Sequence, residues 1–195
     1  MARGPSMKPI GILYATRTGH TRRIAEHIAN NLRGRGFDVQ LKNLDTSIRL
    51  IDYSAAVLAA SVHCGAHERE MVQFVKDHAR ELDNLATAFI SVTLTEAGVE
   101  RPESTPDERQ RFSSEVRRVL DKFFEETGWH PARVKPVAGA LLYTKYNVLL
   151  RFVMKQIAKS AHADTDTSQD HVYTNWEALD RFVEEFAAEL APATA

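Results

Sequence analysis

Short apolar runs alternate with amphipathic runs along the whole chain, and this alternation is the feature that most restricts its fold. The first apolar run, residues 8–15, is followed by residues 21–35, in which apolar side chains recur at helical spacing. The other apolar runs of strand length are 37–41, 55–60, 87–92 and 134–142, and the other helical runs are 68–82, 105–124 and 174–190. Strand and helix in regular alternation predict a parallel sheet with helices on both faces.

Capping patterns support two of the predicted helix starts. Thr105, Pro106 and Glu108 have the spacing of a capping box with proline at the first helical position. Thr174 and Glu177 repeat the threonine-to-acid spacing before the last helical run. We therefore expect one helix to follow Thr105 and the last helix to follow Thr174.

Right-handed crossovers leave few topologies for five parallel strands, and the order 2-1-3-4-5 is the common one. The predicted fold is an α/β, flavodoxin-like three-layer sandwich, with an insertion of about residues 143–172 before the last helix. The 195 residues fit one domain, which we place at 8–191 after a disordered extension at 1–7. Ligands of such sheets bind beyond the carboxyl ends of the strands.

Composition restricts the compartment and the partners. The net charge of −1 gives no reason to expect a nucleic-acid partner. A single cysteine excludes an internal disulfide, the residues from Met1 to Ser6 lack the apolar core of a signal peptide, and no apolar run is of membrane-spanning length. We expect a cytoplasmic protein, and the sequence leaves both a monomer and a homo-oligomer open.

The segment between the first strand and the first helix has the features of a phosphate site. Its glycine permits a tight turn, and the following helix N-terminus favours an anion. No lysine follows as in a nucleoside triphosphate loop, and no GxGxxG string is present. A plain threonine N-cap is the alternative explanation. The predicted phosphate residues are Thr16, Arg17, Thr18, Gly19, His20 and Thr21.

The segments after the third and fourth strands reach the same edge of the sheet, where a flat ring would need apolar contacts and backbone hydrogen bonds. The predicted ring-binding residues are Ser61, Val62, His63, Cys64, Gly65, Ser91, Val92, Thr93 and Leu94. Cys64 has no second cysteine to form a redox pair, and packing is its simpler explanation. No carboxylates at ligand spacing accompany the histidines, so no metal site is predicted.

The phosphate loop and strand order resemble the flavodoxin superfamily over nearly the whole chain. Three later strings are similar to the menaquinone-dependent protoporphyrinogen IX dehydrogenase family, namely AGALLYTKY at 138–146, DTDT at 164–167 and VYTNWE at 172–177. The string SVHCGAH at 61–67 resembles a second-loop segment of that family. His63 and Cys64 stand where that family has Arg and Tyr, and Asn175 stands where it has Asp.

The resemblance implies bound FMN, oxidation of a porphyrinogen in haem synthesis, and a quinone as electron acceptor. A flavin can accept hydride, so the chemistry would belong to the cofactor. His63 and His67 are candidate general bases, because histidine titrates near neutral pH. The alternatives are an electron-carrying flavodoxin, an NAD(P)H-dependent quinone reductase, and a flavodoxin-like module without cofactor.

The insertion contains a basic amphipathic run at residues 146–159. From Thr127 to Ala163 there are six Lys or Arg and no Asp or Glu. Such a helix could lie on an anionic membrane surface, attract porphyrin propionates, or be an ordinary surface helix. With the resemblance, we favour a peripheral site on the inner face of the cell membrane together with substrate attraction. The residues assigned to substrate or membrane are Tyr143, Lys145, Tyr146, Arg151, Lys155 and Lys159.

Overall fold

The structure is a computed structural model, and it describes residues 8–44, 47–145 and 166–190. Its main sheet is parallel, with strand order β2-β1-β3-β5-β6, and the short strand β4 pairs antiparallel with β3. Counting only the parallel strands, this is the predicted order 2-1-3-4-5. The strands of the main sheet are β1 Ile10–Ala15, β2 Val39–Asn43, β3 Ala55–His63, β4 Ala66–His67, β5 Ala86–Thr93 and β6 Arg133–Ala138.

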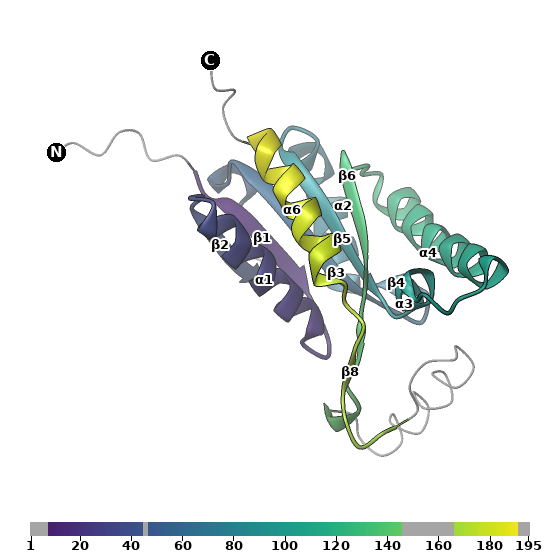
Figure 1. The fold of residues 1–195 in the computed structure, drawn as a ribbon. Coiled ribbons are helices and arrows are strands. Elements are labelled where there is room, and N and C mark those ends of the chain that lie inside the picture. The colour runs from purple at the N-terminus through teal and green to yellow at the C-terminus, as the bar shows by residue number, and fades with distance from the viewer. Residues whose placement is uncertain (1–7, 45–46, 146–165, 191–195) are drawn as a thin grey trace.

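Helices cover both faces of the sheet, as Figure 1 shows. One face packs against α1 and α6, and the other packs against α2 and α4, so the described chain has three layers. The two cores are built mainly from Ile, Val, Leu and Ala side chains that alternate between the faces of the central strands. The helices are α1 His20–Gly34, α2 Arg69–Leu82, α3 Thr95–Glu100, α4 Pro106–Thr127 and α6 Trp176–Leu190, with 3-10 turns η1 Leu50–Asp52 and η2 Tyr143–Lys145.

The capping box before α4 is confirmed. The Thr105 side chain accepts a hydrogen bond from the Glu108 backbone N–H, and the Thr105 N–H donates to the Glu108 carboxylate at 2.9 Å. Gly128 ends the helix in the left-handed conformation, with φ of 70°. The first and last turns of α4 are therefore set by local sequence.

The capping box predicted at Thr174 is wrong. The Ala178 N–H donates to the Asn175 side chain at 3.0 Å, so Asn175 caps α6. The Thr174 hydroxyl instead donates to the Ala138 carbonyl at 2.7 Å, and the hydroxyl oxygen accepts from His20 Nε2 at 2.8 Å. Tertiary hydrogen bonds thus replace the local one that the sequence pattern suggested.

The fifth strand also ends earlier than predicted. β6 stops at Ala138, and the apolar run continues as β7 Ala140–Leu141, which leaves the main sheet and pairs antiparallel with β8 His171–Val172. We call the described residues 140–145 and 166–173 the arm. In Figure 1 the arm extends from the carboxyl edge of the sheet, away from the body of the domain. Leu141, Leu142 and Tyr143 form its own small core.

Two parts of the sequence-based account fall outside the described residues. These are the extension at 1–7 and the amphipathic run at 146–159. No helix in the described ranges is long and apolar enough to cross a membrane.

Candidate functional site

The first loop joins β1 to α1 at the carboxyl edge of the sheet. Gly19 is the N-cap of α1 and has φ of 89°, a left-handed conformation that favours glycine. Its N–H donates to Thr16 Oγ1 at 3.1 Å, which closes the turn. Gly19 has no side chain to cap α1, so the N-cap position leaves backbone N–H groups that can bind an anion. This arrangement supports the phosphate interpretation over the plain threonine cap.

Two of the predicted phosphate residues are buried and support the loop from below. His20 is 3% exposed and donates to Thr174, which ties the first loop to the end of the arm. Thr21 is also buried. Arg17 is exposed, while Thr16, Thr18 and Gly19 are partly exposed. Backbone groups, Arg17 and the partly exposed Thr16 and Thr18 are therefore the parts of this loop that can meet a ligand.

The second loop is a tight β-hairpin. β3 continues to His63 and pairs with β4 through Val62–His67 and His63–Ala66. Cys64 and Gly65 form the turn with φ of 51° and 73°, the combination of a two-residue type I′ hairpin. Cys64 and Gly65 are exposed at the tip. The prediction that Cys64 is a packed residue is therefore wrong, because the hairpin turn places it at the surface. The hairpin thus presents backbone and small side chains at the edge beside the first loop.

His67 and Ser91 lie beneath this hairpin. A hydrogen bond of 2.9 Å joins His67 Nε2 to Ser91 Oγ. The His67 ring packs against Phe123 and Phe89, with ring centroids 4.7 and 5.2 Å away. Burial lowers the pKa of His67 to about 4, so the ring is neutral near pH 7. His67 and Ser91 join the second loop to the third and do not line the surface.

The third loop is shorter than expected because α3 begins directly after β5. The Thr95 N–H donates to Thr93 Oγ1 at 3.3 Å, and the Gly139 N–H donates to the Thr93 carbonyl. Val92 and Thr93 are buried, and Leu94 is partly exposed. Of the predicted ring contacts on this loop, Leu94 is therefore the side chain that can touch a ligand.

Glu68 is a site residue that the sequence analysis missed. Its side chain is 3% exposed, and its carboxylate contacts Arg17 Nε of the first loop at 3.0 Å. The same carboxylate accepts from Ser61 Oγ at 3.0 Å and lies 3.2 Å from His63 Nε2. Charged residues before a helix are usually solvated, so no local signal indicates this burial.

The environment of His63 favours its neutral form. Burial lowers the pKa of His63, and Arg17 lowers it further, while Glu68 acts in the opposite direction. The His63 side chain is 34% exposed, so the ring reaches both Glu68 and the surface. His63 is thus a neutral, accessible imidazole at the carboxyl edge of the sheet.

α3 contributes a buried carboxyl group next to the third loop. Glu96 is 8% exposed, and burial raises its pKa to about 7, with a further rise from Glu100. Lys135 of β6 opposes both effects. No helix is predicted here from the sequence, because the six residues TEAGVE, which include a glycine, are too few for a periodic signal.

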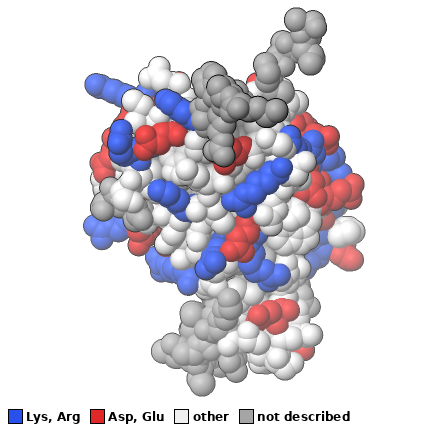
Figure 2. All heavy atoms as spheres, turned by 90° about the vertical axis from the view of Figure 1, so that its left-hand side faces the viewer, with Lys and Arg blue, Asp and Glu red and all other residues white. Residues whose placement is uncertain are grey.

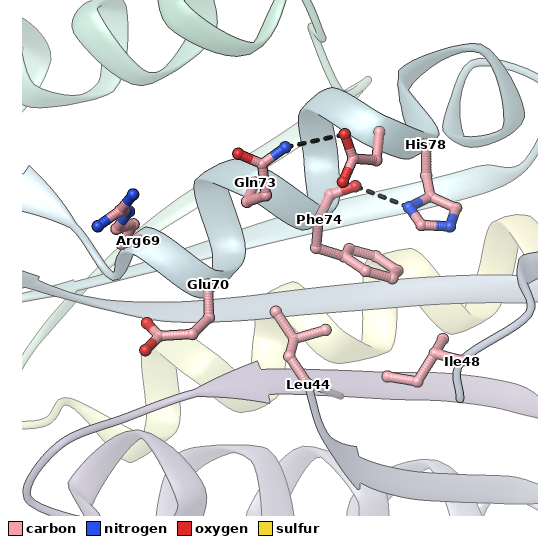
Figure 3. A pocket seen from close by; sticks show the side chains of 8 residues that line it. Leu44, Ile48, Arg69, Glu70, Gln73, Phe74 and His78 are labelled. Atoms are coloured by element: carbon pink, nitrogen blue, oxygen red, sulfur yellow. Dashed lines mark hydrogen bonds between the residues drawn. The ribbon is translucent and has the colours of Figure 1, made fainter. Parts of the chain in front are cut away.

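An apolar pocket of about 490 Å³ lies between α2 and the segment after β2. Figure 3 shows Leu44 and Ile48 facing Phe74 across it. None of its lining residues is among the predicted cofactor residues. The lining residues are Leu44, Ile48, Arg69, Glu70, Gln73, Phe74, Asp77 and His78.

The family model described as a flavodoxin domain matches residues 11–168. The chain belongs to the flavodoxin family. The prediction of FMN as cofactor is confirmed by this membership, and the site fits the group, with a glycine N-cap at the start of α1 for the phosphate and a glycine hairpin for the ring.

Comparison with curated and solved flavodoxin-family proteins gives a consistent result. The chain is 33% identical over 178 residues to the protoporphyrinogen IX dehydrogenase [quinone] of Escherichia coli K12, covering 90% of this chain and 93% of that protein. It is also 33% identical over 181 residues to the protein of the same name from Leishmania major, covering 91% and 74%. A solved short-chain flavodoxin associated with a bacterial microcompartment is 16% identical, with a TM-score of 0.52, covering 95% of this chain and 100% of that chain.

Of the residues predicted to meet substrate or membrane, only Tyr143 and Lys145 are in the described part of the chain. Tyr143 is fully buried in the arm, where its packing accounts for it, and its role toward substrate or membrane stays a prediction. Lys145 is the last residue of η2. Tyr146, Arg151, Lys155 and Lys159 lie outside the described residues.

Proposed function

We propose that this flavodoxin-family protein oxidises protoporphyrinogen IX to protoporphyrin IX, using FMN and a quinone as electron acceptor. The observation that carries the proposal is the 33% identity, over about nine tenths of the chain, to two curated proteins with that name. The family membership and the site geometry support the flavin-dependent part of it. The substrate and acceptor follow from the relatives.

The described residues provide two parts of a flavin site at one edge of the sheet. Gly19, Thr16 and the backbone N–H groups at the start of α1 would hold the phosphate. The hairpin at Cys64 and Gly65, with Leu94 of the third loop, would contact the ring. Ser61, Ser91 and His67 fix these loops from below through the hydrogen bonds described above.

FMN, when bound, is a two-electron oxidant that can accept hydride. Each two-electron oxidation of a porphyrinogen also releases one proton, from a pyrrole nitrogen or a meso carbon, and this proton needs an acceptor. We assign that role to His63 in preference to His67. His63 is neutral and partly exposed, whereas His67 is 6% exposed and enclosed by Phe89 and Phe123.

The distribution of charge supports an enzyme over an acidic electron carrier. Figure 2 shows Lys and Arg interspersed with Asp and Glu over the face that it presents, and the net charge is −1.

We further propose that the insertion brings the protein to a membrane surface, because its basic run would be attracted to anionic lipid.

The donor and the acceptor can be tested on the flavin itself. Under anaerobic conditions, protoporphyrinogen IX should bleach the visible absorbance of the FMN-loaded protein, and a menaquinone analogue should restore it. NADPH in place of protoporphyrinogen is the comparison. Rapid bleaching by NADPH and none by protoporphyrinogen would instead assign the chain to the nicotinamide-dependent quinone reductases.

A further inference from the structure

Glu68 is a buried acidic residue that contacts two loops of the proposed flavin site. Its carboxylate is 3% exposed and contacts two loops at once, through Arg17 on one side and through Ser61 and His63 on the other. A buried carboxylate is costly unless charged or hydrogen-bonding partners surround it. Arg17 and Ser61 meet that requirement as an ion-pair partner and a hydrogen-bond donor, and His63 Nε2 lies 3.2 Å away. All three residues come from the loops of the proposed flavin site.

The backbone fixes where this carboxylate lies. The Glu68 N–H donates to the Ser61 carbonyl at 3.1 Å, and the Glu68 carbonyl accepts from Met71 and Val72 in the first turn of α2. Although Glu68 is the N-cap residue of α2, its side chain does not cap the helix. The side chain therefore contacts the loops and does not cap α2, which lowers the stability of the helix terminus slightly.

We propose that Glu68 is a positioning residue that holds the His63 ring and links its proton affinity to the occupancy of Arg17 by an anion. The role deepens the proposed function, since His63 is the assigned proton acceptor. The three contacts of one buried carboxylate carry this proposal.

The contact with Glu68 selects which ring nitrogen of His63 can accept a proton. Nε2 lies 3.2 Å from the carboxylate without hydrogen-bond geometry, so the charge of Glu68 favours a ring proton on Nε2 and leaves Nδ1 as the acceptor. Once Nδ1 is protonated, the imidazolium faces a carboxylate that stabilises it. Glu68 therefore orients the neutral His63 ring before proton transfer and stabilises the imidazolium after it.

Arg17 provides the link to an anion. Its side chain is 65% exposed although Nε contacts Glu68, so most of the guanidinium is accessible to a phosphate group. Arg17 also faces Glu70 and Cys64, while the charged groups that act on His63 are Glu68 and Arg17. An anion at Arg17 offsets the positive charge near His63 and competes for the guanidinium, so both effects raise the proton affinity of His63.

The proposal predicts opposite shifts for two substitutions that remove opposite charges. The pKa of His63 can be followed by NMR titration of its ring protons in the full-length protein, with and without FMN. Glu68→Gln should lower this pKa, and Arg17→Gln should raise it. Arg22→Gln is the matched control, because Arg22 pairs with Glu26 on the exposed side of α1 and should leave the pKa of His63 unchanged.

Inorganic phosphate tests the link in the FMN-free protein. Phosphate should raise the pKa of His63 relative to chloride at equal ionic strength, and this increase should be absent in Arg17→Gln. Because Arg17 is exposed and Ser61 still donates to Glu68 in its absence, we expect that variant to fold even if Glu68→Gln does not. Shifts of the same sign in both variants, no shift in Arg17→Gln, or a phosphate effect that survives it would overturn the proposal. No substrate or turnover is involved, so the result is independent of the proposed reaction.

Discussion

At the scale of single residues, the site has two layers. The upper layer consists of groups that reach the surface, such as Arg17, Gly65 and Leu94. The lower layer consists of buried polar side chains that join the loops, among them Glu68 and His67. Sequence reasoning identified most members of both layers but could not separate them, because burial depends on tertiary packing. It missed Glu68 for the same reason.

The neutral, buried His67 predicts a loss of stability in acid. Its pKa is about 4 in the folded protein and 6.5 in the unfolded chain, so the unfolded chain binds more protons between these values. The contribution of His67 to the free energy of unfolding is therefore complete above pH 6.5 and decreases toward pH 4, by about 3 kcal/mol at most.

The substitution His67→Gln isolates this effect. Glutamine can keep a hydrogen bond to Ser91 but loses the ring contacts, so the variant should be less stable than the wild type at pH 8. Urea unfolding should show the difference shrinking as the pH falls from 6.5 to 4. The exposed His130→Gln is the control. A difference that stays constant over this range would contradict the assigned protonation state.

Glu96 predicts the opposite pH dependence. Its pKa is about 7 in the folded protein and 4.5 in the unfolded chain, so the folded protein binds more protons in this window and its stability decreases as the pH rises through it. Glu96→Gln should raise the free energy of unfolding at pH 8 by about 2 kcal/mol and change it little at pH 4.5. Urea unfolding at both pH values checks this, with the exposed Glu103→Gln as control. An equal change in the free energy of unfolding at both pH values would show that the pKa of Glu96 is not raised in the folded protein.

At the scale of elements, the sequence predicted those whose signals are local and missed those that tertiary contacts create. α4 follows its capping box, and the central strands follow their apolar runs. The apolar run at 134–142 is continuous, so the sequence did not predict that β7 leaves the main sheet and pairs with β8. Apolar character alone does not indicate which strand a segment will pair with. Thr174 matched a capping pattern, yet its hydroxyl bonds to Ala138 and His20 instead.

The short helix α3 depends on a close contact with α4. A Cβ atom added to Gly98 would lie 2.4 Å from the ring of Phe112, which is too close for both to remain in place. Gly98→Ala should therefore destabilise the protein by about 1–3 kcal/mol, despite the higher helix propensity of alanine. Thermal unfolding checks this, and adding Phe112→Leu should restore part of the loss.

Gly34→Ala is the matched control for the packing of α3. Gly34 is in the last turn of α1, and no atom lies within 4 Å of a Cβ placed there. This substitution should stabilise the protein by about 0.5–1 kcal/mol, because only helix propensity changes. If both alanine variants shifted the melting temperature equally, α3 would not pack on α4 as described.

At the scale of the whole molecule, one edge of the sheet gathers every feature that the proposed function uses. The crossover pattern brings the ends of β1, β3 and β5 together there, and the arm extends from the same edge. Topology was predictable because it follows from the order of elements and the handedness of crossovers. The hydrogen bond between His20 of the first loop and Thr174, the residue that follows the arm, was not predictable, since 154 residues separate the two side chains.

The most direct test of the account is quinone-dependent formation of protoporphyrin IX, followed by its fluorescence without oxygen, in the wild type, Gly19→Asp and Gly36→Asp. Both glycines have φ near 90°, but only Gly19 borders the proposed phosphate site. We predict that wild type and Gly36→Asp bind FMN and form porphyrin, whereas Gly19→Asp loses both. A wild type that binds FMN but forms no porphyrin, or a Gly19→Asp variant that retains both properties, would contradict the account.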